Sequence, residues 1–327
     1  MDMNPRLTIA ILAFAANVLG AQEAPPRRAH HALVYDEGRK KVLMTGGSTP
    51  VNGGQTFTFF NDLWTFDGTR WTPETPSGAM LSGVALAYDA KGNRVLSFGG
   101  YNGQPIADLR VLEKGGWRTL GSLPEMPASE AGFVYDRRLD RFIAFGGSAG
   151  PGRAYSRTWS WSGTAWSEIT GDGPPARQAH AMVYDERRER VVVFGGAGGG
   201  QPGTRPPMLD DTWEFDGSKW TRSASNGATP SARVSPGAAY DSRRGRLVIF
   251  GGADSTGFLA DTWAWDGTSW KKLADTGPEA RVMGYMAYDT SRDRIVLFGG
   301  RKGYPDGDLN DTWEFDGTRW SRVSPAG

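Results

Sequence analysis

The sequence predicts an all-β protein built from six copies of one four-stranded unit. Its 46 glycines and 20 prolines make up about a fifth of the 327 residues, where about 12% is usual, and both residues weaken helix interiors. A Tyr-Asp pair followed ten residues later by Gly-Gly occurs six times. Two tryptophan positions seven residues apart recur in five of the six copies.

The repeated positions keep a fixed spacing through the whole chain. The aspartates are Asp36, Asp89, Asp136, Asp185, Asp241 and Asp289, and the first glycines are Gly46, Gly99, Gly146, Gly195, Gly251 and Gly299. The tryptophan pairs are Trp64/Trp71, Trp159/Trp166, Trp213/Trp220, Trp263/Trp270 and Trp313/Trp320, and the second copy has Arg110 with Trp117. The segment between the glycine pair and the first tryptophan absorbs nearly all variation in length. The copies therefore share one framework and differ in one loop.

Each copy is interpreted as four strands in a fixed order. The first ends in the Tyr-Asp pair, as in residues 31–36 (HALVYD), and the second is an unbroken apolar run that ends in the glycine pair, as in residues 190–196 (RVVVFGG). An unbroken run predicts burial on both faces. In the third strand Trp213 and Phe215 alternate with Thr212 and Glu214, which is the period of two of a strand. The fourth carries the second tryptophan, after an Asp-Gly turn that suits a hairpin.

A four-stranded unit that repeats about every 50 residues and is buried on both faces predicts a blade of a β-propeller, so six units predict six blades. Each blade is contiguous in sequence, and we expect the ring to close by packing of the first blade on the last rather than by a shared blade. A single domain is expected over residues 22–327. Its blades span about residues 28–72, 81–118, 128–167, 177–221, 233–271 and 281–322.

The units resemble kelch repeats. The resemblance lies in the glycine pair, the aromatic of the third strand and the tryptophan of the fourth, and it covers Arg28 to about Arg322. It implies a six-bladed propeller similar to the central domain of galactose oxidase, in a bacterial exported protein. The copper chemistry of galactose oxidase is excluded, because it needs a cysteine cross-linked to tyrosine and the chain has no cysteine. The lack of cysteine also excludes disulfides and a thiol nucleophile.

Residues 1–21 are typical of a secretory signal peptide. Arg6 precedes an apolar stretch from Leu7 to Leu19, and the small residues Gly20 and Ala21 follow. The apolar stretch is too short to span a bilayer, which takes roughly 20 residues. We expect a secreted or periplasmic bacterial protein without stable membrane insertion after cleavage. The alternative is a buried strand or an uncleaved anchor at this end.

The two faces of the predicted propeller differ in variability. The turns that join strands 1 to 2 and strands 3 to 4 form one face, here called the turn face, where an aspartate and a basic residue recur in every copy. The loops between strands 2 and 3 and between blades form the other, the loop face, where the copies differ. Loops on a rigid scaffold are the usual place for binding. The candidate ligand-binding residues of the loop face are Phe57, Phe59, Phe60, Tyr101, Asn102, Tyr155, Arg205, Phe258, Arg301 and Tyr304. The alternative is that the aromatic residues cap blade edges.

A second candidate group lies near the start of the first strands, which should line the central channel. It consists of Arg28, His30, His31, Glu130, Arg177, His180, Arg233 and Arg281. Arginines at a funnel mouth can hold a carboxylate by bidentate pairing. The alternative is that they pair with groups of neighbouring blades. Catalytic residues cannot be assigned from the sequence.

Charge and motif content narrow the partners and cofactors. With 37 Lys and Arg against 36 Asp and Glu, the net charge is +1, and nothing indicates nucleic-acid binding. No cofactor is expected. The one metal candidate is a calcium-loop-like run of Asp306, Asp308 and Asn310.

Together these features favour an exported, non-enzymatic binding or scaffold module, expected to be a monomer, that recognises a glycan or a protein through the loop face. The alternative is a carbohydrate-active enzyme, such as a sialic-acid-like sugar mutarotase or isomerase that acts in the funnel. In that case Glu130, His30, His31 or His180 would serve as general acid and base.

Overall fold

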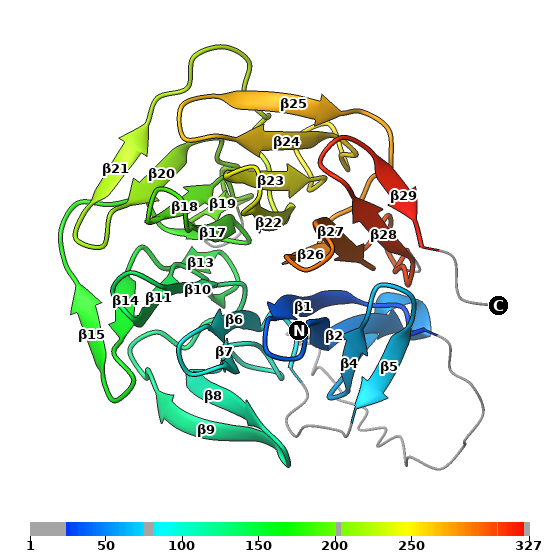
Figure 1. Cartoon of the computed structure of the whole chain (residues 1–327), viewed down its shortest axis with the longest axis horizontal. Coiled ribbons are helices and arrows are strands. Elements are labelled where there is room, and N and C mark those ends of the chain that lie inside the picture. Colours follow the sequence, from blue (N-terminus) through cyan, green and yellow to red (C-terminus); the bar gives the residue numbers. More distant parts are fainter. Residues whose placement is uncertain (1–23, 75–80, 201–203, 306, 324–327) are drawn as a thin grey trace, which may run out of the picture.

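The computed structural model describes residues 24–74, 81–200, 204–305 and 307–323. Six antiparallel sheets are arranged around a central axis (Figure 1). Each contains four strands paired in chain order, and the sheet of the first blade carries one additional strand. The fold is therefore an all-β six-bladed propeller, as the repeats predict. Every blade is contiguous, and the first packs directly on the sixth.

The strands follow one another in blade order. Blade 1 contains β1 (Ala29–Asp36), β2 (Lys41–Val51), the additional β3 (Thr56–Phe59), β4 (Leu63–Phe66) and β5 (Trp71–Glu74), with a 3-10 turn, η1 (Asn52–Gly54). Blade 2 contains β6 (Ala85–Asp89), β7 (Arg94–Phe98), β8 (Asp108–Glu113) and β9 (Gly116–Ser122). Blade 3 contains β10 (Gly132–Asp136), β11 (Arg141–Phe145), β14 (Thr158–Trp161) and β15 (Trp166–Ile169).

Blade 4 contains β17 (Ala181–Asp185), β18 (Arg190–Phe194), β20 (Thr212–Phe215) and β21 (Trp220–Ser223). Blade 5 contains β22 (Gly237–Asp241), β23 (Arg246–Phe250), β24 (Thr262–Trp265) and β25 (Trp270–Ala274). Blade 6 contains β26 (Tyr285–Asp289), β27 (Arg294–Phe298), β28 (Thr312–Phe315) and β29 (Trp320–Arg322). Short strands in the loops are β12 (Ser148–Gly150), β13 (Arg153–Ala154), β16 (Arg177–Gln178) and β19 (Ala197–Gly198). Within the described ranges no helix is long or apolar enough to cross a bilayer.

The second strand of each blade forms the centre of the core. In β18, for example, Val192, Val193 and Phe194 are fully buried, and β27 repeats this pattern. Because each of these strands lies between its neighbours in the sheet and between two adjacent blades, both of its faces are covered. This burial explains why the apolar runs are unbroken.

The glycine pair joins each blade to the next. Both glycines of every pair have φ between 58 and 113°, the left-handed region that side chains rarely adopt. The second glycine donates its N–H to a carbonyl at the start of the following blade in all six copies. These bonds are Gly47 to Leu81, Gly100 to Ala128, Gly147 to Arg177, Gly196 to Arg233, Gly252 to Arg281 and Gly300 to Arg28. The last of them closes the ring between blades 6 and 1.

The tryptophans of the fourth strands form a second set of bonds between blades. Four of them donate their indole N–H to a threonine in the third strand of the preceding blade, at 2.9–3.0 Å. The pairs are Trp71 with Thr312, Trp220 with Thr158, Trp270 with Thr212 and Trp320 with Thr262. The indole nitrogen of Trp166 is buried without a partner, because the preceding blade has Leu109 at the threonine position.

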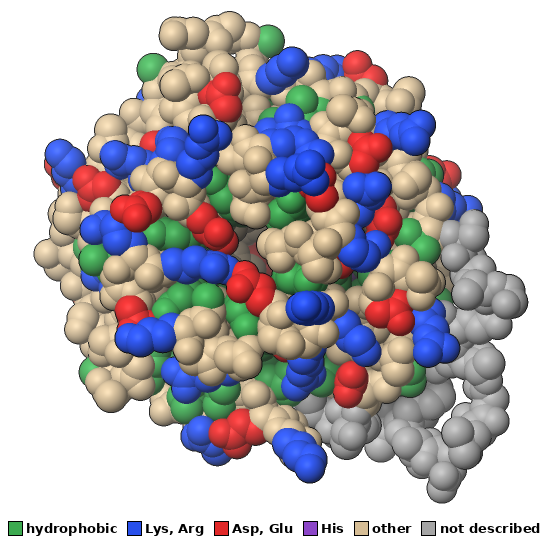
Figure 2. All heavy atoms as spheres, in the orientation of Figure 1, with side chains coloured by type: hydrophobic (Ala, Val, Ile, Leu, Met, Phe, Trp, Pro, Cys, Tyr) green, Lys and Arg blue, Asp and Glu red, His purple; other side chains and the backbone are tan. Residues whose placement is uncertain are grey.

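The recurring aspartates organise the turns between strands 1 and 2. Asp89, for example, accepts hydrogen bonds from the backbone N–H of Gly92 at 2.8 Å and from the guanidinium of Arg94 at 2.8 Å. Figure 2 shows one face of the molecule, where basic and acidic side chains are interspersed around a central hollow. That face therefore lacks an extended patch of one sign.

Candidate binding site

Six equivalent residues, one from each blade, form the mouth of the central channel on the loop face. They are His30, Gly83, Glu130, Ala179, Ser235 and Met283, and all have φ between 51 and 62°. Five backbone hydrogen bonds of 2.8–3.2 Å join them in this order from blade to blade. A left-handed non-glycine residue costs about 1 kcal/mol, and here these bonds hold the backbone in that conformation. The chemistry of the mouth is thus set by a few polar side chains, chiefly those of His30 and Glu130.

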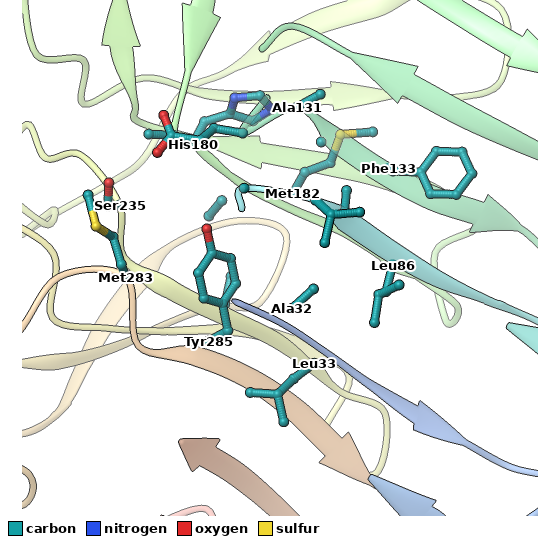
Figure 3. A pocket seen from close by; sticks show the side chains of 18 of the residues that line it. Ala32, Leu33, Leu86, Ala131, Phe133, His180, Met182, Ser235, Met283 and Tyr285 are labelled. Atoms are coloured by element: carbon teal, nitrogen blue, oxygen red, sulfur yellow. The ribbon is translucent and has the colours of Figure 1, made fainter. Parts of the chain in front are cut away.

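Below this mouth lies a cavity of about 140 Å³ that residues of all six blades line. An apolar layer formed by one residue from each blade separates it from a second cavity of about 230 Å³ towards the turn face. The layer consists of Leu33, Leu86, Phe133, Met182, Ala238 and Met286. In Figure 3 the ring of Tyr285 projects into the upper cavity, which His180, Met182 and Met283 also line. Burial raises the pKa of Tyr285, and the charge of Glu130 raises it further, so the phenol stays neutral.

His30 and Glu130 face each other at the channel mouth. The Nδ1 atom of His30 lies 3.0 Å from Oε1 of Glu130, and about a fifth of each side chain is exposed. The two groups thus satisfy each other across the mouth, from blades 1 and 3. A ligand that enters here meets a paired acid and base rather than a free charge.

Beside the mouth, the loop face contains a cavity of about 240 Å³ that we call the loop cavity. Phe57, Phe59 and Tyr101 form its aromatic walls. Its polar lining consists of His30, Ser48, Ser82, Ser129 and Glu130. The rings of Phe59 and Tyr101 have centroids 6.3 Å apart, and all three aromatic side chains are partly exposed. Gly83 and Glu130 line both this cavity and the upper channel cavity, so the two are neighbours.

The wall of the loop cavity is a hairpin that extends the sheet of blade 1 by one strand. Strand β2 extends beyond the blade and pairs with β3, with Ser48 opposite Phe59 and Pro50 opposite Phe57. The hydroxyl of Tyr304, from blade 6, donates a 2.6 Å hydrogen bond to the carbonyl of Gly54 at the hairpin tip. On the other side, the hydroxyls of Ser48 and Ser82 lie 3.1 Å apart. These contacts hold the hairpin between blades 6 and 2.

The prediction that four arginines line the funnel is wrong. Arg28, Arg177, Arg233 and Arg281 are at most 1% exposed, and each forms a bidentate pair with an aspartate of its own blade at 2.6–3.0 Å. Each also donates to the carbonyl of a glycine pair, as Arg177 does to Gly195 at 3.0 Å. The partner is not in a neighbouring blade, which corrects the alternative interpretation as well. No guanidinium of this set remains for a ligand carboxylate.

The aspartates that engage these arginines were missed in the sequence, although a signal was present. They are Asp62, Asp211, Asp261 and Asp311, each two residues before a strand-3 tryptophan, whose indole N–H they also accept at 2.7 Å. These four lie in the blades that have the arginine, whereas blade 2 has Leu81 at the arginine position and its aspartate, Asp108, pairs with Arg110 at 2.7 Å. Blade 3 has Ala128 and Arg157 at the two positions, so both members of the pair are absent together.

His31 and His180 do not present a charged imidazole to a ligand. The ring nitrogens of both are buried without a hydrogen-bond partner, and each ring packs edge-on against a phenylalanine, Phe298 and Phe145 respectively. Burial, and next the charge of Arg177, lowers the pKa of His180 to about 3. Burial likewise holds the pKa of His31 well below its usual range. Both rings are therefore neutral in the fold, and that of His180 also lines the upper channel cavity.

The remaining predicted loop residues are dispersed over the face. Phe60 packs under the guanidinium of Arg28 at 4.0 Å, and Tyr155 packs against the core of blades 2 and 3. Asn102, Arg205 and Phe258 are exposed on three different blades. Arg301 is buried and bonded to Asp308 at 2.6 Å. Of the ten predicted residues, the structure brings Phe57, Phe59 and Tyr101 together, with Tyr304 at the hairpin tip.

The calcium prediction has little support among its described members. Asp308 is buried and both of its oxygens bond to Arg301, while Asn310 is exposed. Asp306 lies outside the described residues. Over the described part of the chain, no group of three or more His, Asp or Glu side chains converges as a metal site would need. Calcium binding stays an untested prediction.

A family model, the KLHDC2/KLHL20/DRC7 Kelch-repeats domain, matches residues 140–327. The match spans more than half of the chain and begins within blade 3. No curated protein matches the chain.

Proposed function

The chain belongs to the kelch-repeat family, and on that premise we propose that it is a non-enzymatic binding module whose loop face recognises a protein partner. Kelch propellers generally bind protein partners. The observation that carries the proposal is the loop cavity, where Phe57, Phe59 and Tyr101 remain partly exposed beside a paired His30 and Glu130. Aromatic side chains in a partly open cavity are the usual anchors of a protein interface.

The same geometry argues against the enzyme alternative. A sugar isomerase in the funnel needs an acid or base together with a group that holds the substrate. The four arginines considered for that role are buried in ion pairs, and the rings of His31 and His180 are neutral. His30 and Glu130 bond to each other. A glycan in place of a peptide in the loop cavity is the second ligand class that the test below covers.

Export belongs to the proposal as well, since residues 1–21 have the pattern of a signal peptide. Fractionation of bacteria that express the full chain should find it outside the cytoplasm with a new N-terminus near residue 22. Retention in the cytoplasm with residues 1–21 intact would contradict export.

The binding proposal is tested by selecting ligands from a random peptide library and a glycan array on the purified protein. We expect peptides whose affinity falls about tenfold or more in Phe59→Ala and Tyr101→Ala, which corresponds to about 1.4 kcal/mol or more. Phe258→Ala is the matched control, because Phe258 is an exposed aromatic of the loop face that does not line the cavity. Thermal midpoints of the variants show that they fold.

Two results would count against this assignment. Peptides that bind equally well to all variants would move the site away from the loop cavity. If only glycans bind, and their affinity falls in Tyr101→Ala, the loop cavity remains the binding site but its ligand is a glycan.

A further inference from the structure

The hairpin of blade 1 presents an unpaired strand edge next to the loop cavity. In an antiparallel pair, opposite residues alternate between those that exchange hydrogen bonds and those that do not. The N–H of Phe60 bonds to the carbonyl of Gly47, and the register continues through Phe59 with Ser48 and Phe57 with Pro50. The pairs of Phe59 and Phe57 are therefore the non-bonded ones, and Pro50, which has no N–H, fits that position.

It follows that the backbone N–H and C=O groups of Phe57 and Phe59 point away from β2. Thr56 and Thr58, in contrast, direct theirs towards Val51 and Thr49. None of the described residues forms a backbone hydrogen bond or a β-bridge with the outer edge of β3. Two residues thus offer two donors and two acceptors in the spacing of an extended strand.

This edge is short, with four residues, but it lacks the charged residues and the proline that guard many exposed edges. Natural sheets guard their edges with charged residues, proline or a covering segment. Residues 48–61 contain no charged residue, and β3 itself reads Thr-Phe-Thr-Phe, which has high strand propensity. The comparable loop hairpin of blade 3 has a charged residue on its edge, Arg153 in β13. An unguarded, uncharged edge is a template for strand addition.

We propose that the protein partner binds as an extended, uncharged polypeptide segment that adds as a strand to the outer edge of β3. This deepens the proposed function and rests on it. Every second side chain of the added segment lies on the same side of the hairpin as Phe57 and Phe59, which is the side of Tyr101 and the loop cavity. Backbone bonds to β3 supply the affinity, and the aromatic cavity selects the side chains.

The charge distribution identifies the occupant as neutral. The hairpin carries no charge, and the one carboxylate of the loop cavity, Glu130, is already paired with His30. A charged side chain placed against the hairpin would lose hydration without gaining a counter-charge from residues 48–61. A second copy of this chain fits less well, because a four-residue edge is far smaller than the roughly 1,200 Å² that a stable dimer buries. A flexible segment can contact both the edge of β3 and the loop cavity, so its binding does not depend on the area of the edge alone.

The test uses a peptide selected on the protein and measures amide hydrogen exchange by NMR with and without it. We expect the exchange rates of the amide protons of Phe57 and Phe59 to fall by a factor of about ten or more in the complex, because these protons become hydrogen-bonded. Thr56 and Thr58 are the internal controls, since their N–H groups are already directed at β2. When the backbone amides of the peptide are N-methylated one at a time, methylation at every second residue should abolish binding, and methylation at the residues between them should not.

The outcomes separate this inference from the proposed function. A peptide that depends on Tyr101 but leaves the exchange of Phe57 and Phe59 unchanged would overturn strand addition and keep the loop cavity as the binding site. Loss of binding on N-methylation at consecutive residues would also overturn it. If the protein dimerises with rising concentration in the absence of peptide, and the amides of Phe57 and Phe59 are then protected from exchange, the occupant of the edge is a second copy of this chain and not a separate partner. Failure of the proposed function itself is seen in the affinity measurements on the variants, where the selected peptides would bind Tyr101→Ala as tightly as the unchanged protein.

Discussion

Residue by residue, burial decides what the conspicuous side chains of this chain do. Arginines and histidines at the start of the first strands suggest a ligand site when they are considered alone. In the fold, each such arginine meets the aspartate two residues before a tryptophan, as Arg233 meets Asp261 at 2.7 Å. Removing one member of a buried ion pair costs about 3–5 kcal/mol, because the other is left without compensation. In the other two blades no such charge is left alone, because blade 3 has Ala128 and Arg157 at the two positions and Asp108 of blade 2 pairs with Arg110.

The buried histidines predict a pH dependence of stability. The folded protein protonates His180 only near its lowered pKa of about 3, whereas the unfolded chain protonates it near 6.5. Between these values the unfolded state binds more protons, so the free energy of unfolding falls as pH drops below about 6.5. Replacing His180 by phenylalanine should remove about 2–3 kcal/mol of the decrease between pH 7.5 and pH 4.5. Urea unfolding of both proteins across this range measures the difference.

The pH slope, not the absolute stability, is the informative quantity here. Phenylalanine at position 180 changes packing next to Gly146 equally at every pH, and so leaves the slope to report the proton alone. Equal slopes in the two proteins would mean that the His180 ring is protonated in the folded state, and hence solvated.

At the scale of single elements, the glycine pair is the feature that links one blade to the next. An added Cβ at Gly99 would lie 2.3 Å from the carbonyl oxygen of Ala128 in the next blade. Gly53, in the hairpin tip, has a similar φ of 65° but nothing within 4 Å of the same atom. The two positions therefore separate the cost of a left-handed backbone from the cost of a clash between blades.

We expect Gly53→Ala to destabilise by about 1 kcal/mol, from the backbone conformation alone. Gly99→Ala should cost about 1–3 kcal/mol more, because the next blade must shift to admit the methyl group. Denaturant midpoints with unchanged m-values measure both. Similar costs at the two positions would show that the blades have room to move apart at this bond.

The elements also show how far the sequence alone can be interpreted. Offsets of ten and seven residues fix the blades, because each strand repeats one environment six times and the copies reinforce one another. The hairpin of β2 and β3 extends one sheet only, and in the repeat pattern its residues fall in the variable segment between strands 2 and 3. The choice of Phe57, Phe59 and Tyr101 from ten candidates depends on which loops meet across blades, as in the contact between Phe59 and Tyr101. Local patterns do not contain that information.

On the scale of the whole molecule, the closing seam between blades 6 and 1 is built like the interior seams. Gly300 donates to Arg28 at 3.0 Å, just as Gly252 donates to Arg281 at 2.9 Å. Trp71 donates to Thr312 at 2.9 Å, as Trp270 does to Thr212 at 3.0 Å. The closing seam therefore has the same two kinds of bond as the seam between blades 4 and 5, although it joins the first blade of the chain to the last.

This equivalence predicts equal costs for equal substitutions at the closing seam and inside the ring. Thr312→Val and Thr212→Val each remove the acceptor of a buried tryptophan N–H while keeping nearly the same volume, and the orphaned donor should cost about 1–3 kcal/mol in either place. Urea unfolding should give one cooperative transition for both variants, with free energies of unfolding that agree within about 0.5 kcal/mol. If the seam opened before the rest, the Trp71 bond would already be broken at the midpoint of the main transition. Thr312→Val would then leave that midpoint unchanged while Thr212→Val lowered it, and the ring would be closed by the covalent chain rather than by its contacts.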